Sequence, residues 1–246
     1  MIIDFHSHIK RNIKENRFEI EELLEDMKKN HVDKRCVSAI DGPSIREQNE
    51  YVKNIVLEHD NLFAFAVINP KEENSIKELE YIIDSNIFYG IEFNGFYHGY
   101  NPESCEFLDD IFNMISKTKL IVKIFTGIGA NGVPQQWTRW IKQYNNIKFV
   151  MLHMGCFDYG YSCVDLAMDY KNVYLETSNQ YEVQIFNKAF QNIEAERILF
   201  GSQYPNKFTK NSISLFDYFN LDKNVLNKIF FENANKLLNE VRQEKL

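Results

Sequence analysis

Cysteines are few in this sequence, and their spacing excludes two kinds of small-protein scaffold. The four cysteines, Cys36, Cys105, Cys156 and Cys163, form no Cys-x-x-Cys pair. Such isolated positions fit neither a zinc knuckle nor a disulfide framework. We therefore expect free thiols in a reducing compartment, the cytoplasm. Nothing in the sequence around Cys156 indicates an activated thiolate, so no nucleophilic cysteine is predicted.

Long apolar runs and basic runs are also missing. No apolar stretch approaches the ~20 residues needed to span a bilayer. The opening MIIDFHSHIK lacks the basic region and apolar run of a signal peptide. The formal net charge is -7, with Lys and Arg scattered, which argues against nucleic acid or membrane as the main partner. We expect a small-molecule substrate; a homodimer is compatible with the sequence, but no residue indicates one.

Short apolar runs alternate with longer amphipathic stretches along the whole chain. Runs rich in Ile, Val, Phe or Tyr predict strands at 2–8, 35–40, 62–69, 88–94, 120–126, 147–154, 172–178 and 197–202. Helices are predicted between them, for example at 18–30, 45–59, 74–86, 105–117 and 134–144, with a terminal helix at 224–242.

This alternation predicts parallel βαβ units, and eight such units close into a (β/α)8 TIM barrel. A doubly wound open sheet is the alternative, but no glycine-rich phosphate loop follows the first strand. No linker or low-complexity stretch divides the 246 residues, so a single domain over residues 1–246 is expected. The long loop that begins near Asn94 then lies on the face where barrels form active sites.

The strongest local feature is the segment Asp4-Phe5-His6-Ser7-His8 at the end of the first predicted strand. Side chains of a strand alternate between faces, so Asp4, His6 and His8 are expected on one face and Phe5 and Ser7 on the other. Two imidazoles at this spacing can converge on one cation, since neutral His is a common zinc ligand. The alternative is a pair of polar residues that hydrogen-bond to their neighbours.

A third histidine, His153, ends the sixth predicted strand. In a barrel it lies at the same end as His6 and His8, because the carboxyl ends of parallel strands share one face. An isolated His at a strand end is more often structural. Three of them from two strands favour a functional site.

Several phrases, taken in order, resemble the amidohydrolase superfamily, in its branch of aminocarboxymuconate semialdehyde decarboxylase-like enzymes. The opening IDFHSHI is similar to the first-strand motif of that branch, and FAVINP fits its third strand. KFVMLHMG, NVYLETS and RILFGSQYP resemble the motifs of the sixth, seventh and eighth strands. KIFFENANKLL resembles the closing helix. The ordered series spans nearly the whole chain and is more specific than any one motif.

This resemblance implies a barrel with a divalent metal, most often zinc, at the carboxyl ends of its strands. It implies that His6 and His8 bind the metal. It also implies that His153 orients or deprotonates a metal-bound water or the substrate. The chemistry it implies is hydrolysis or non-oxidative decarboxylation of a small carboxylated molecule.

Two positions depart from the family pattern. Where the family has a His after its fifth strand, this chain has Phe125, which has no lone pair to offer a metal. Where the family has a catalytic Asp in its eighth-strand phrase, this chain has Gln203, a neutral amide that cannot act as a general base. A catalytic zinc generally needs about three protein ligands. The third could come from His153 or from Glu92, although Glu92 could equally form a structural pair with a cation.

Lys123 is a candidate for that cation, because it lies two residues before Phe125 and shares its face. A buried ammonium needs a partner or loses its proton, and Asp4, Glu92 and Glu176 are the candidates. Our hypothesis is that Lys123 supplies positive charge near the place of the missing ligand. The alternative is that Lys123 extends to the surface.

The candidate site therefore has three parts. His153, Lys123 and Gln203 occupy the catalytic positions, and His6 and His8 are the metal ligands. Glu92, Asn94, His98 and Phe125 are expected to line the substrate site. Three functions stay open: a metal-dependent hydrolase or decarboxylase, a binding or regulatory barrel without catalysis, and a metal-free lyase or isomerase that uses Lys123, His153 and a carboxylate.

Overall fold

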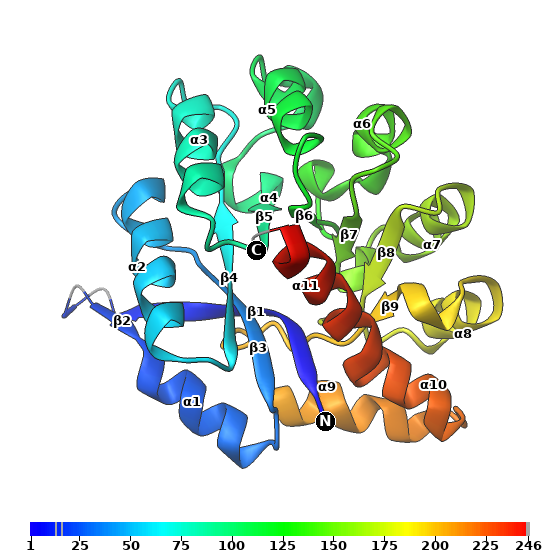
Figure 1. Ribbon diagram of the computed structural model, residues 1–246. Coiled ribbons are helices and arrows are strands. Elements are labelled where there is room, and N and C mark those ends of the chain that lie inside the picture. The colour runs from blue at the N-terminus through cyan, green and yellow to red at the C-terminus, as the bar shows by residue number, and fades with distance from the viewer. Residues whose placement is uncertain (13, 16, 245–246) are drawn as a thin grey trace.

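The computed structural model describes residues 1–12, 14–15 and 17–244, and it contains one curled sheet surrounded by helices (Figure 1). Its strand order in the described residues is β2-β1-β3-β4-β5-β6-β7-β8-β9. All neighbouring pairs are parallel except β2 (Arg17–Glu19), which pairs antiparallel with the outer end of β1. The parallel strands are β1 (Ile3–Asn12), β3 (Lys34–Ala39), β4 (Leu62–Val67), β5 (Gly90–Phe93), β6 (Ile121–Phe125), β7 (Phe149–Leu152), β8 (Val173–Glu176) and β9 (Ile198–Leu199).

The chain directly after β9 closes this sheet into a barrel. The backbone N–H of Phe5 donates to the carbonyl of Phe200 over 2.9 Å, and that of His8 donates to the carbonyl of Tyr204 over 2.7 Å. A parallel bridge joins Ser7 to Tyr204. These bonds satisfy the free edge of β1, and the predicted (β/α)8 barrel is confirmed, with each predicted strand at its expected place.

The helices form the outer layer (Figure 1). They are α1 (Ile20–Lys29), α2 (Ile45–Glu58), α3 (Ser75–Ser85), α4 (Gly95–His98), α5 (Leu108–Ile115), α6 (Thr138–Gln143), α7 (Gly160–Asp169), α8 (Val183–Asn192), α9 (Thr209–Ser214), α10 (Lys223–Asn227) and α11 (Asn233–Glu244). The predicted terminal helix is divided, because a π-helical turn at Lys228–Glu232 separates α10 from α11. None of the described helices combines the length and apolarity that a membrane crossing needs.

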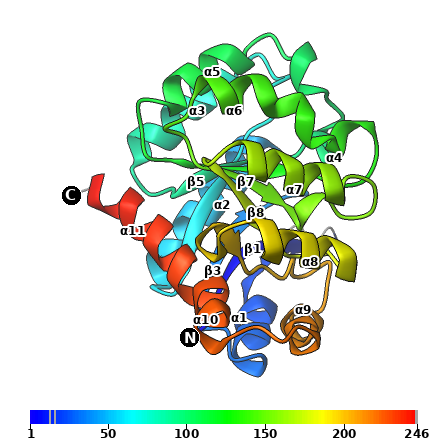
Figure 2. The same cartoon turned by 90° about the vertical axis from the view of Figure 1, so that its right-hand side faces the viewer.

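Helix α11 closes the end of the barrel at which the strands begin. Its residues Leu237, Leu238 and Val241 belong to the same buried apolar cluster as Ile3 and Phe5 of β1. Full burial of side chains of this size is worth about 1.5–3 kcal/mol each. Figure 2 shows α4, which follows β5, on the opposite side of the sheet from α11. One end of the barrel is therefore filled with apolar side chains, and polar groups collect at the other.

A β-bulge in β1 changes the faces expected from strict alternation. Asp4 lies opposite Arg35 and Ser7 opposite Val37, so three steps along β1 match two along β3. Such an extra residue re-aims side chains, and bulges are frequent next to active sites. Phe5 consequently faces inward, as His6 and His8 do, whereas Asp4 is bound to Arg35. The prediction that Asp4 shares a face with the two histidines was wrong.

Candidate functional site

Three histidine rings meet at the carboxyl ends of the strands. His6 and His8 extend from β1, and His153 follows β7 directly. The ring centroid of His6 lies 4.7 Å from that of His8 and 5.1 Å from that of His153. All three are buried. Burial lowers the pKa of His6 well below its ordinary value and that of His153 to about 3, so both rings are neutral. Neutral imidazole is the form that binds metals.

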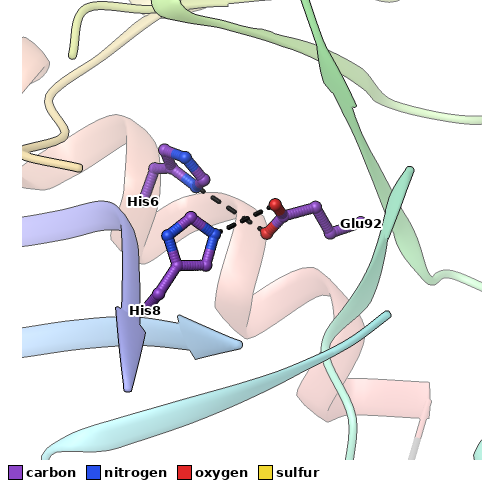
Figure 3. A group of neighbouring side chains, drawn as sticks. All are labelled: His6, His8 and Glu92. Atoms are coloured by element: carbon purple, nitrogen blue, oxygen red, sulfur yellow. Dashed lines mark hydrogen bonds and ion pairs between the residues drawn. The ribbon is translucent and has the colours of Figure 1, made fainter. Parts of the chain in front are cut away.

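Glu92, at the inner face of β5, joins the two histidines of β1 (Figure 3). Its Oε1 lies 3.0 Å from Nε2 of His8, and its Oε2 lies 3.8 Å from Nδ1 of His6. The hydroxyl of Ser38 donates to Oε2 over 2.7 Å. Glu92 was expected either as a metal ligand or as the structural partner of a cation, with Lys123 as the candidate. Among the described residues, Glu92 makes no ion pair with Lys123.

His6 is the unusual member of this group. It is only 1% exposed, yet neither Nδ1 nor Nε2 has a hydrogen-bond partner among the described residues. Nδ1 of His8 is likewise buried without a partner. Buried polar atoms are nearly always hydrogen-bonded, because desolvation without compensation costs about 1–3 kcal/mol. The free nitrogens therefore indicate a site for a ligand that accepts lone pairs.

The donor atoms fit a divalent cation in two overlapping ways. One ligand atom each from His6, His8 and Glu92 lies within 4.8 Å of the others, and the same holds for His6, His153 and Glu176. Both groups combine imidazole nitrogens with a carboxylate oxygen, a donor set suited to zinc and other first-row metals. His6 is common to both groups.

Glu176, at the end of β8, is part of the site through His153. Its Oε2 accepts the backbone N–H of His153 over 3.0 Å and the hydroxyl of Ser178 over 2.7 Å. The Ser178 hydroxyl is in turn 2.8 Å from Nδ1 of His153. Burial raises the pKa of Glu176 to about 7. From the sequence, Glu176 was expected only as a partner for Lys123, and nothing in the sequence pattern indicated its contact with His153.

Both positions that depart from the family pattern lie at the site. The Phe125 ring is 5.3 Å from the His153 ring and stacks on Phe96 at 5.4 Å, so it forms an apolar wall. Gln203 adopts a left-handed backbone conformation with φ of 57°, and its N–H donates to the carbonyl of His6 over 2.8 Å. Its Oε1 is buried with no partner among the described residues.

Asn94 and His98 flank the site on the loop after β5. The side-chain oxygen of Asn94 accepts the N–H of Tyr97 over 2.9 Å and so caps α4. Ser, Thr, Asp and Asn are the usual residues at such a cap. His98 is partly buried, and burial lowers its pKa. Its Nδ1 has no partner in the described chain. A substrate contact stays a prediction for both residues.

Lys123 is fully buried, but none of its predicted partners binds it. Its ammonium donates to the carbonyl of Phe5 over 2.5 Å and lies 3.6 Å from the ring centroid of Phe65. No carboxylate of the described residues lies within ion-pair distance of it. The expectation of a pair with Asp4, Glu92 or Glu176 was therefore wrong, as was the surface alternative, because the Phe5 carbonyl of β1 and the Phe65 ring of β4 contact the buried ammonium instead.

A cavity of about 260 Å³ opens beside His8. It is bounded by the outer part of β1, the loop after β3 and the loop after β9, with His8, Ile9, Lys10, Arg11, Ile40, Asp41, Pro205 and Asn206 as lining. The lining contains two cationic side chains, one anionic side chain and the ring of His8.

Comparison with known proteins assigns the family. Residues 3–239 match the amidohydrolase family Amidohydro_2, so the chain belongs to this family. No curated protein sequence matches it.

Several solved structures share the fold. An uncharacterized TIM-barrel protein from Bordetella bronchiseptica has a TM-score of 0.80 at 16% identity, over 98% of this chain and 99% of the other. A dihydroxybenzoic acid decarboxylase from a Polaromonas species, with manganese and the inhibitor 2-nitroresorcinol, has a TM-score of 0.78 at 16% identity, over 100% and 98%. A 5-carboxyvanillate decarboxylase from Novosphingobium aromaticivorans, complexed with manganese and 4-hydroxy-3-methoxy-5-nitrobenzoic acid, has a TM-score of 0.78 at 14% identity, over 97% and 96%.

Proposed function

We propose that this protein is a divalent-metal-dependent enzyme that removes a carboxyl group from a small, planar carboxylated molecule. Hydrolysis of a related substrate is the neighbouring possibility within the same family. His6 and His8 would hold the metal, with Glu92 as the third ligand in place of the family's fifth-strand His. A bound divalent cation would polarise the carboxylate or carbonyl of the substrate and lower the pKa of a bound water.

The observation that carries this proposal is the pair of free nitrogens on His6. They are buried, have no hydrogen-bond partner among the described residues, and lie within reach of two further histidines and two carboxylates. A purely structural cluster would satisfy these atoms with neighbouring groups. A metal ligand, in contrast, needs its lone pair free.

The surroundings of the histidines support a planar carboxylated substrate. Phe96 and Phe125 offer stacked rings next to His153, which suits an unsaturated or aromatic ring. Two structural neighbours act on carboxylated aromatic molecules, in line with this substrate class. In decarboxylation a proton replaces the departing CO2 on carbon, and His153 would relay that proton, accepting it on Nε2 from a bound water and delivering it to the carbon.

Metal analysis of protein purified without chelators tests the metal. We expect near-stoichiometric zinc or manganese, lost in His6→Ala and retained in His59→Ala, a control at the far end of α2. A panel of hydroxybenzoates and other carboxylated aromatics is then assayed for CO2 release. Metal-loaded protein that releases no CO2 from any of them would count against decarboxylation.

Phe125 and Gln203 favour a second candidate, a barrel that binds a small molecule without turning it over. Both remove donor groups that the family uses, and neither side chain replaces them chemically. This candidate predicts protein that is metal-free as purified and gains metal in the double variant Phe125→His with Gln203→Asp. The same metal analysis therefore separates the two candidates.

A further inference from the structure

We propose that Ser178 and Glu176 are positioning residues that fix the tautomer of His153, placing its proton on Nδ1 and leaving the lone pair of Nε2 for the site. Nothing in the family assignment gives Ser178 this role. The inference deepens the proposed function, because a free Nε2 is what a metal ligand or proton acceptor needs. The tautomer itself exists in the metal-free protein, so it can be tested separately.

The direction of each hydrogen bond follows from the number of protons available. Glu176 accepts three hydrogen bonds: from the N–H of His153 to Oε2, from the N–H of Ser178 to Oε1 over 2.6 Å, and from the Ser178 hydroxyl to Oε2. At alkaline pH Glu176 is an ionised carboxylate, which only accepts hydrogen bonds, and its three converging donors satisfy it. The Ser178 hydroxyl has a single proton, and it uses this proton in its hydrogen bond to Glu176.

The same count then determines the state of His153. Because the Ser178 hydroxyl donates its hydrogen bond to Glu176, its oxygen can only accept a hydrogen bond from Nδ1 of His153, 2.8 Å away. A neutral imidazole carries one N–H, so that proton lies on Nδ1 and Nε2 keeps its lone pair. No described residue hydrogen-bonds to Nε2. In metal sites the second ring nitrogen is held in this way by a neighbouring group.

The backbone around His153 is held by hydrogen bonds to Glu176 of β8 and to Thr126, which follows β6. His153 and Met154 adopt left-handed conformations, with φ of 65° and 47°, which residues with a Cβ rarely occupy. The carboxylate of Glu176 binds the N–H of His153, and the Thr126 hydroxyl donates to the Leu152 carbonyl and accepts the Gly155 N–H. Strain of this kind persists only where the surroundings impose it, typically at functional sites.

Gly201 shows how closely Glu176 is fitted. A Cβ at this position would lie 2.1 Å from Oε1 of Glu176 and 3.2 Å from Cβ of His6. The absence of a side chain at residue 201 therefore lets Glu176 stand beside His6 while it binds Ser178 and His153.

Nitrogen-15 NMR of the imidazole rings, in metal-free protein at alkaline pH, reads the tautomer directly. The chain has six histidines, and the His153 signals are identified by their loss in His153→Gln. We expect the proton on Nδ1 in the native protein and a shift towards the other tautomer in Ser178→Ala. Ser178→Thr, which keeps a hydroxyl, should restore the native pattern. Ser202→Ala is the matched control, because Ser202 makes the same two bonds to a carboxylate, Asp4, and no histidine ring of the described residues is bonded to its hydroxyl.

Metal affinity gives a second readout. Loss of a group that orients a metal ligand typically costs about 10- to 100-fold in metal affinity. Because His153 and Glu176 form the second donor group with His6, we expect a loss of that size in Ser178→Ala if the metal uses this group, and recovery in Ser178→Thr. A native protein with its proton on Nε2 would overturn the proposal even if Ser178→Ala failed to fold, and so would an unchanged tautomer in folded Ser178→Ala. Absence of metal binding with the proton on Nδ1 would overturn the proposed function alone.

Discussion

Two buried polar clusters begin on β1 within five residues of each other, and they differ in how completely their atoms are bonded. Outside the barrel wall, Asp4 binds Arg35 over 2.8 Å, and Arg35 also binds Asp26 and Thr209. Every one of these side chains is paired. Inside, His6 and His8 keep free nitrogens despite equal burial. The satisfied cluster stabilises the fold, and the unsatisfied one retains binding capacity for a ligand.

The largest effect is expected where the satisfied cluster is broken. Arg35→Ala leaves the buried charge of Asp4 without its cationic partner, which costs about 3–5 kcal/mol. Urea unfolding followed by circular dichroism measures the loss. The matched control is Arg17→Ala, whose partner Glu15 is exposed with it, and here we expect about 0–1 kcal/mol. Equal losses in the two variants would contradict the distinction between the clusters.

The unsatisfied cluster should respond to metal instead. A ligand that binds only the folded state at 100 times its Kd adds about 2.7 kcal/mol. We expect zinc or manganese to raise the unfolding free energy of the native protein by this amount and that of His6→Ala by nothing measurable. Thermal unfolding with and without metal gives the comparison. A metal-induced shift that survives in His6→Ala would show that the cation binds elsewhere.

Gly201 tests whether the inner cluster depends on close packing. In Gly201→Ala the new methyl group would overlap Oε1 of Glu176, and forcing extra volume into a packed interior costs about 1–3 kcal/mol. Because Glu176 must move, metal affinity should fall together with stability. Titration with metal and urea unfolding measure both. A variant with native affinity and native stability would mean that the carboxylate has room to shift.

The smallest effect is expected at the aromatic wall. Phe96 is 51% exposed but stacks on Phe125, and such pairs contribute about 0.5–1.5 kcal/mol. Phe96→Ala should lose about that much, measured as the urea midpoint. Phe208, 79% exposed and without a described ring contact, serves as the control, and Phe208→Ala should change stability by less than about 0.5 kcal/mol. The reverse order would argue against a stacked wall.

Much of the barrel could be predicted from the sequence, because a buried parallel strand appears as a short apolar run, and this run does not depend on which strands pair with it. The eight strands and the order of their connections follow from that pattern alone. The helix predicted from residue 18 begins instead at Ile20, since residues 17–19 pair with the end of β1 as β2. That pairing involves backbone groups, which leave no mark in the apolar periodicity.

The sequence predicts which histidines form the site, but it does not predict the hydrogen bonds that their side chains make. Strand ends can be read from sequence, so the meeting of His6, His8 and His153 was expected. The bulge was not, because one extra residue in a strand has no signature in a single sequence, and it moved Asp4 away from the site. Asn94 could have been assigned to a helix cap, since Asn followed by a short turn is a common cap. The links from His153 to Ser178 and Glu176 depend on side-chain directions that only the folded backbone determines.

The bulge also has a bearing on how such a protein changes over time. It lets two consecutive residues of one strand belong to different parts of the barrel. Phe5 packs in the buried apolar cluster shared with α11, and the next residue, His6, lies in the histidine group at the carboxyl ends of the strands. Substitutions at positions such as Phe125 and Gln203 would therefore alter the site while the apolar cluster continues to hold the barrel together. An ancestral catalyst could acquire a new ligand shell, or lose its old one, without first becoming unstable.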